Sequence, residues 1–206
     1  MPRLDAQTAA ELTNAVRELE ARSCAEVVVE VRARSGSYAH ADARFGAVTA
    51  FLALIVLLFS QWSFAPWWVV IDTAVAYALG HLIARSSNSV RRLMTSEAER
   101  AAQVRVAGSS VFFERGVANT ERESGVVIYY GMLEQRIEIL ADRGVLLAVP
   151  SLEWNEIIAA ARASRPSDTR DLVATLRALQ SLLEKHFPRL EGDRDELANA
   201  PRFETE

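Results

Sequence analysis

The chain is poor in several residue types that carry chemistry in other proteins. Its 206 residues include a single cysteine, Cys24, and three histidines. One cysteine cannot form a disulfide within the chain, which suits a reducing compartment. The sequence also has no Gly-x-Ser-x-Gly elbow, no glycine-rich phosphate loop and no Cys-x-x-Cys motif. None of these common catalytic constellations can therefore be assigned.

The charge balance also narrows the range of partners. The chain has 27 acidic and 23 basic residues, a formal net charge of −4. This balance gives no reason to expect a nucleic-acid partner. The first thirty residues contain no apolar run behind a basic start, so we do not expect a cleaved signal peptide.

What the chain does have is two long apolar runs near its middle. Residues 45–60 carry no charge, and residues 67–84 carry only Asp72 and His81 among acidic and basic side chains. A transmembrane helix needs roughly 17–25 mostly apolar residues. We therefore expect a transmembrane helical hairpin within residues 38–92, with spans at about 45–61 and 66–84. The alternative is a helical hairpin buried in a soluble core.

The residues at the two ends of the runs favour the membrane. Trp62, Trp67 and Trp68 cluster at the connection, as in an aromatic belt at a membrane–water interface. Arg44 and Arg85 lie at the opposite end. Further arginines there are Arg32, Arg34, Arg91 and Arg92. By the positive-inside rule, both termini and the folded domain are cytoplasmic and only the connection faces outward.

The remaining sequence predicts helices and short strands. Apolar residues at helical spacing predict helices at about 8–22, 96–114, 151–163 and 169–186. Alternating β-branched residues predict strands at 26–32, 125–130 and 136–140. Residues 145–149 fit a fourth strand or an extended connection. The acidic residues from 191 onward are expected to be loosely ordered.

The order of these elements predicts the fold class. The first strand reaches the second only through a long crossover, which favours a parallel pair, and a tight link makes the second and third strands antiparallel. The result is an α/β fold with a small mixed sheet flanked by helices. Its parts are residues 1–37 and 93–190, interrupted by the hairpin and followed by the tail at 191–206.

Several motifs resemble the TPM-domain family, which includes thylakoid acid-phosphatase-like proteins and photosystem repair factors. The run SGVVIYYGMLEQRIEILADRGV at 124–145 is followed by a proline and Trp154, and the opening helix and strand contain Glu26. The ending matches through His186-Phe187-Pro188, Gly192-Asp193 and Asp195-Glu196-Leu197. The chain is most similar to a bacterial membrane subgroup with two spans inserted in the domain, which implies a bacterial cytoplasmic (inner) membrane location.

The resemblance also implies a candidate metal site. Some family members bind calcium through acidic residues at the ends of the sheet, and the matching positions here are Glu26 and Asp142. Calcium takes about 6–8 oxygen ligands, so these two carboxylates make a loose site for Ca or Mg. Glu123, Glu134 and Glu138 are candidate helpers. The alternatives are a solvated Glu26 or one paired with Arg143, and an Asp142 that forms a turn.

Two functions remain open at this point. The first is a membrane-anchored interaction or assembly module, bound to the lipid bilayer and to a larger membrane complex or a second copy. The second is a weak divalent-metal-dependent phosphatase held at the membrane, as described for some relatives. No complete catalytic constellation can be named, which favours the first.

Overall fold

A computed structural model describes residues 6–164, 166, 170–190, 197 and 202–204. The chain forms two compact units. The first, here the α/β unit, contains residues 1–35 and 101–206; the second, the hairpin unit, contains residues 36–100.

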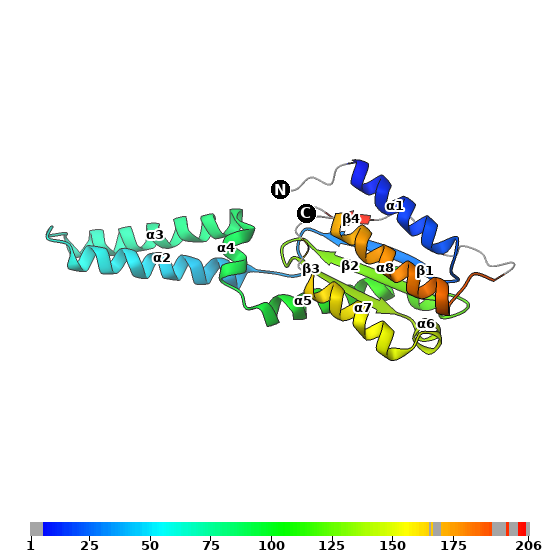
Figure 1. Ribbon diagram of the computed structural model, residues 1–206. Coiled ribbons are helices and arrows are strands. Elements are labelled where there is room, and N and C mark those ends of the chain that lie inside the picture. Colours follow the sequence, from blue (N-terminus) through cyan, green and yellow to red (C-terminus); the bar gives the residue numbers. More distant parts are fainter. Residues whose placement is uncertain (1–5, 165, 167–169, 191–196, 198–201, 205–206) are drawn as a thin grey trace. The chain divides into compact units, whose positions relative to one another are not determined.

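A mixed sheet with the strand order β3-β2-β1-β4 lies at the centre of the α/β unit (Figure 1). Strands β1 (Glu26–Arg32) and β2 (Gly125–Gly131) pair in parallel along their whole length. Strand β3 (Arg136–Ala141) pairs antiparallel with β2. These three strands, and the sense of each pairing, confirm the prediction from sequence. Strand β4 (Arg202–Glu204) pairs in parallel with β1 and was not predicted.

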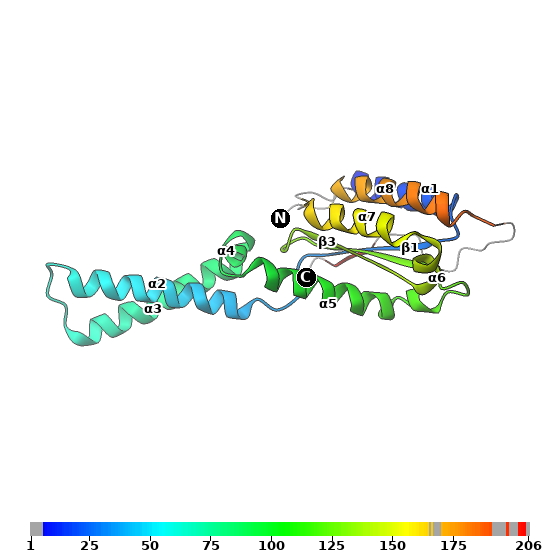
Figure 2. The ribbon, with the colours of Figure 1, turned by 60° about the horizontal axis from the view of Figure 1, so that its bottom comes forward.

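Helices cover both faces of this sheet. Helices α1 (Ala6–Glu20), α7 (Ser151–Ala163) and α8 (Arg170–His186) lie over one face, and α5 (Glu97–Glu114) runs along the other (Figure 2). Each helix matches a predicted segment to within a few residues. The first residue of the helix predicted at 169–186 lies outside the described residues.

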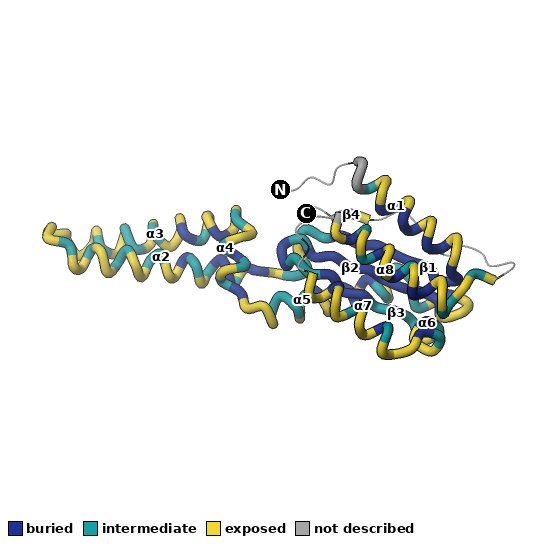
Figure 3. The backbone as a smooth tube through the Cα atoms, viewed as in Figure 1, coloured by how far each residue is buried: buried dark blue, intermediate teal, exposed yellow. Residues whose placement is uncertain are grey.

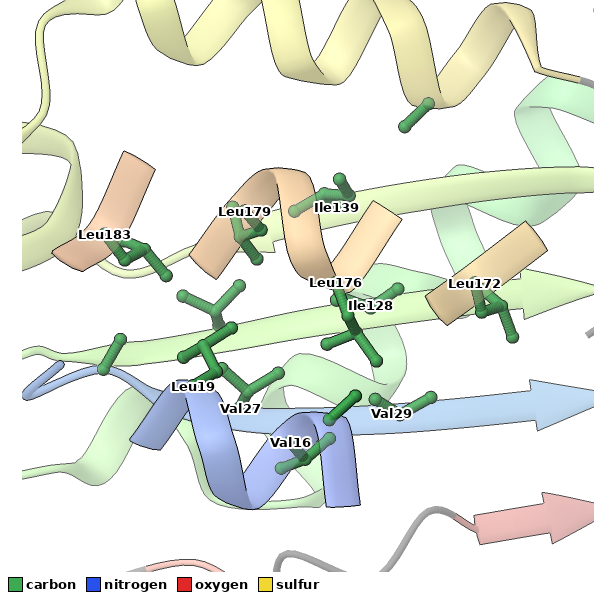
Figure 4. Packing of buried hydrophobic residues seen from close by; sticks show 14 of the residues in the cluster. Val16, Leu19, Val27, Val29, Ile128, Ile139, Leu172, Leu176, Leu179 and Leu183 are labelled. Atoms are coloured by element: carbon green, nitrogen blue, oxygen red, sulfur yellow. The ribbon is translucent and has the colours of Figure 1, made fainter. Parts of the chain in front are cut away.

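The larger core lies beneath α1, α7 and α8. In β1, Val27, Val29 and Val31 point to this side and are at most 2% exposed, as the alternation in the sequence predicts. They meet leucines that recur at helical spacing in α8 and an apolar stripe of α1 (Figure 4). The labelled members of this core are Val16, Leu19, Val27, Val29, Ile128, Ile139, Leu172, Leu176, Leu179 and Leu183.

A smaller core forms where α5 packs on the other face, around Val28, Val104, Val111 and Tyr129. The first turn of α5 is capped by Ser96, whose Oγ accepts a hydrogen bond from the Glu99 N–H at 3.1 Å. After the helix ends, the backbone turns at Gly116 with φ of 68°, a left-handed conformation that other residues rarely adopt. A 3₁₀ turn, η1 (Val117–Asn119), then leads to β2.

One local prediction is wrong. Residues 145–149 were expected to be extended, but residues Arg143–Ala148 form a short helix, α6. Asp142 precedes it with extended backbone angles, and its Oδ1 accepts a hydrogen bond from the Arg143 N–H at 2.7 Å. Asp142 thus caps the start of α6 and stabilises a helical turn, which the apolar pattern of residues 145–149 alone does not predict.

The hairpin unit consists of α2 (Ala39–Phe59), α3 (Pro66–Ser86) and the short α4 (Asn88–Leu93). Helices α2 and α3 approach closely where glycine faces a side chain. A Cβ added at Gly80 would lie 1.9 Å from the Thr49 Oγ1, and one at Gly46 would lie 3.0 Å from Tyr77. The Thr49 hydroxyl also donates to the Ala76 carbonyl across the helix pair at 3.0 Å. Glycine thus permits the close approach.

A buried ion pair joins the first turn of α2 to α4. The Arg91 guanidinium donates two hydrogen bonds of 2.8 Å to the two carboxylate oxygens of Asp42. Both residues are less than 9% exposed. The Thr95 hydroxyl donates to the Arg91 carbonyl, which fixes the end of α4. Bidentate geometry of this kind is the strongest form of the arginine–carboxylate contact.

Most of the segment from 191 lies outside the described residues, so its expected loose order is untested there. The described part differs from the expectation. Residues 202–204 form the edge strand β4, and the Leu197 N–H donates to the Glu26 Oε2 at 3.1 Å.

We predict that Gly80→Leu will weaken the packing of α2 against α3. Overpacking of this kind costs about 1–3 kcal/mol, because the Thr49 side chain has to move. The control is Ala78→Leu, at an exposed position of the same helix. Thermal unfolding in detergent should show a lower midpoint for Gly80→Leu and little change for Ala78→Leu. Equal midpoints would contradict the close contact.

Candidate functional site

The two acidic residues expected to bind a metal lie at the same edge of the sheet. Glu26 is the first residue of β1 and pairs with Gly125 of β2. On the other side of β2, the Asp142 N–H donates to the Gly125 carbonyl at 2.8 Å. One strand therefore separates the two residues, which places their backbones about 10 Å apart at normal strand spacing.

Both carboxylates already have structural partners. Glu26 is 4% exposed and accepts the Leu197 N–H, so its interpretation as a solvated strand residue is wrong. Asp142 caps α6 through Oδ1, as its interpretation as a turn residue predicts, while its Oδ2 is buried without a hydrogen-bond partner among the described residues.

Two of the three candidate helpers lie away from this pair. Glu123 lies at the same edge, with an exposed side chain. The Glu134 Oε1 accepts the Ser35 N–H at 2.8 Å, just beyond the opposite end of β1. Glu138 on β3 is bound by Arg162 of α7. Within the described residues, no group of three His, Cys, Asp or Glu side chains is arranged to hold a metal ion. A site at Glu26 and Asp142 would need ligands from backbone and water.

We predict that Asp142→Ala destabilises the α/β unit by about 1 kcal/mol, the usual cost of losing a helix cap. Asp142→Asn keeps a capping oxygen, so its free energy of unfolding, measured with urea, should be close to that of the unchanged protein.

Repeating the measurement with millimolar CaCl₂ or MgCl₂ separates a cap from a ligand. If Asp142 only caps α6, neither ion stabilises the unchanged protein more than it stabilises Asp142→Asn. Stabilisation by an ion that disappears in Asp142→Asn would instead establish the metal site.

A buried charge network lies nearer the carboxyl ends of β1 and β2. The Glu30 side chain is fully buried, and its two oxygens accept hydrogen bonds of 3.0–3.2 Å from Arg115, the residue after α5. Arg32 donates to the same carboxylate at 3.3 Å and reaches Glu114 at 3.5 Å. Since a buried carboxylate requires such partners, this network fixes the end of α5 against the sheet.

A second set of hydrogen bonds involves Tyr129 of β2. Its hydroxyl donates to the Ser35 Oγ at 3.0 Å, and the Ser35 N–H donates to Glu134. Burial raises the pKa of Tyr129 to about 12. Each of these groups is bound by another part of the protein, so the arrangement ties strand ends and loops together.

The sequence contained one signal for this network that was not used. In the strand EVVVEVR, Glu30 interrupts a run of valines at a position that faces α5. A carboxylate in the middle of a buried strand predicts a basic partner. The identity of that partner, Arg115, depends on how α5 crosses the sheet.

We predict that Tyr129 makes the α/β unit less stable at high pH. The phenol has a higher pKa when folded than its usual value of 10. Its stabilising contribution is therefore complete below pH 10 and is lost as the pH rises towards 12. Urea unfolding between pH 9 and pH 12 should show a steeper loss of stability for the unchanged protein than for Tyr129→Phe. Parallel curves would contradict the burial of the phenol.

The residues expected at a membrane interface separate into two groups. Trp62, Trp67 and Trp68 surround the link between α2 and α3, are 46–77% exposed, and the last two stack with ring centroids 4.2 Å apart. Arg44 lies in the second turn of α2, where it donates to the Met94 carbonyl at 3.1 Å. Arg85 lies in the last turn of α3 and is exposed.

Comparison with known proteins gives evidence for the fold alone. No family model matches the chain, and no curated protein matches it. Among solved structures, it is similar to the NMR structure of the BA42 protein from the psychrophilic bacterium Bizionia argentinensis. The TM-score is 0.55 at 16% sequence identity, over 98% of this chain and 99% of that chain. The class that follows is an α/β protein with a mixed sheet flanked by helices and with two long apolar helices.

Proposed function

We propose that this chain is a membrane-anchored, TPM-like protein that acts as an interaction or assembly module. The hairpin inserts into the cytoplasmic membrane of a bacterium, and the α/β unit lies on the cytoplasmic side with both termini. No activity of its own is required in this role.

The observation that carries the proposal is the exposed apolar surface of α2 and α3 (Figure 3). Only 11% of the apolar window of each helix is buried, whereas the core helix of a soluble protein is mostly buried. Val56, Phe59 and Val70 are each more than two-thirds exposed. A continuous apolar surface over two helices calls for lipid or protein to cover it.

The length of the helices fits the same role. Each has 21 residues, which at 1.5 Å per residue is about 30 Å, the thickness of the hydrocarbon layer. Tryptophans at the link and arginines at the other end are the expected interface residues.

Three exposed leucines that lie close together in the sequence, here the leucine patch, support a partner for the α/β unit. Leu146 and Leu147 of α6 and Leu152 of α7 are 47%, 74% and 72% exposed. Grouped apolar side chains on a folded domain often mark a protein–protein contact.

The first test concerns the membrane. We predict that the unchanged protein stays in the membrane pellet after alkaline carbonate extraction. The double variant Leu52→Arg/Val75→Arg places a charge in the middle of each span, which makes membrane insertion less favourable by about 2.5–3.5 kcal/mol per residue. This variant should leave the pellet or be degraded. The matched control Leu147→Arg/Leu152→Arg changes two exposed leucines of the α/β unit and should remain. Extraction of the unchanged protein would contradict the anchor.

The second test concerns the partner. A crosslinked pulldown in mild detergent should recover one stoichiometric membrane complex with the unchanged protein. The Leu147→Arg/Leu152→Arg variant should recover about tenfold less, the effect of ~1.4 kcal/mol. Val106→Arg/Phe113→Arg changes exposed apolar residues of α5 and serves as the control. Recovery that does not depend on the leucine patch would contradict this surface. Metal-dependent phosphomonoesterase activity that Asp142→Ala removes would support the enzyme alternative instead.

A further inference from the structure

Helix α3 carries one ionisable side chain within its apolar run and away from its cytoplasmic end. Asp72 lies six residues after Pro66, the first residue of the helix, which is about 9 Å along the helix axis. Trp67 and Trp68, the residues expected at the membrane interface, come before it. In the proposed membrane arrangement, Asp72 therefore lies within the hydrocarbon layer. Its side chain is too short to reach back to the interface as lysine and arginine do, so the carboxylate needs a partner at its own depth.

The hairpin unit itself provides no such partner. Among the described residues, the Asp72 carboxylate takes part in no hydrogen bond and no ion pair. The hydroxyl of Thr73, the next residue, donates to the Val69 carbonyl at 2.7 Å. Residues 45–80 contain no arginine, lysine or histidine. A basic partner therefore has to come from another chain.

A second copy of this chain does not supply that partner. The first basic residues of α3 are His81 and Arg85, about 14 and 20 Å further along the helix and therefore towards the cytoplasmic end. A second hairpin in the same orientation has these groups at the same depth, so it brings its own Asp72 beside the first. Two carboxylates side by side disfavour each other's charge. The partner is therefore a different protein, with a basic residue at the depth of Asp72.

The other side chains on the Asp72 face of α3 suit contact with another helix. Residues three, four and seven positions apart lie on one face of a helix. Trp68, Val75 and Leu79 have these spacings from Asp72 and are 46–56% exposed. A helix packed along this face makes apolar contacts on both sides of the carboxylate. Such contacts exclude water, and an ion pair is stronger where water is excluded.

We propose that Asp72 binds a transmembrane helix of a second membrane protein through a basic side chain, arginine or lysine, in the outer third of that helix. The apolar residues of the same face provide the packing, and the charge pair provides the selectivity. Ionisable residues within membrane spans commonly pair with one another in this way. The inference deepens the proposed interaction role by giving the chemistry of the partner, and it rests on that role.

The test pairs the full-length chain with a probe of known sequence. The probe is a tagged segment with one leucine–alanine span of the same length as α3, one arginine at the depth of Asp72, and basic residues at its cytoplasmic end to set its orientation. The control probe has leucine in place of that arginine. After crosslinking of co-expressed chains in membranes, recovery of the arginine probe should be about tenfold higher, a ratio typical of one polar contact between transmembrane helices.

Three variants show whether the carboxylate is responsible. Asp72→Asn removes the charge with little change of shape and should lower recovery of the arginine probe to that of the leucine probe. Asp72→Glu keeps the charge and should retain most of the recovery. The matched control Val70→Asn adds an amide at an exposed position of the same helix and should recover as much as the unchanged protein.

Equal recovery of the two probes by the unchanged protein would overturn the proposal, as would recovery of the arginine probe that Asp72→Asn does not lower. Carbonate extraction of the same membranes reports separately whether the hairpin is anchored. A failed anchor is therefore distinguished from a missing contact at Asp72.

Discussion

The structure depends on the parallel pairing of β1 with β2. The two strands are joined by residues 33–124, which contain the entire hairpin unit, and still pair along seven residues. Because β1 and β2 are neighbours in the sheet, the two ends of the segment that joins them must both lie at the sheet. Closing a long segment costs little more than closing a moderate one, since the entropy grows with the logarithm of length.

The hairpin unit is built to return the chain in this way. Its two long helices have equal lengths and pack closely at Gly80 and Gly46. The buried Asp42–Arg91 pair then joins the start of α2 to α4, after the second helix. A buried pair of this kind adds little net stability, because both charges lose water, but loss of one partner is costly. Its contribution is best understood as geometric: it fixes where the hairpin begins and ends.

Much of the fold could be predicted because its signals are local. The alternation around Val27, Val29 and Val31 and the helical stripe of α8 depend only on burial of one face. Strand β4 could not be predicted in this way, because its three residues form a strand only through pairing with β1. Helix α6 was missed because capping by Asp142 outweighed the apolar run that follows it. The acidic candidates Glu26 and Asp142 were placed at the correct edge, but Glu30 and Arg115 meet only through the crossing of α5 over the sheet.

The most direct test measures which side of the membrane each unit faces. In a Cys24→Ser background, a Ser63→Cys variant places a thiol in the link between α2 and α3, and a Glu156→Cys variant places one on exposed α7. Spheroplasts with an intact inner membrane would be treated with a maleimide that cannot cross it. We expect labelling of Ser63→Cys without lysis and of Glu156→Cys only after lysis. Labelling of both variants only after lysis, or of Glu156→Cys in intact spheroplasts, would contradict a hairpin that crosses the membrane with its domain in the cytoplasm.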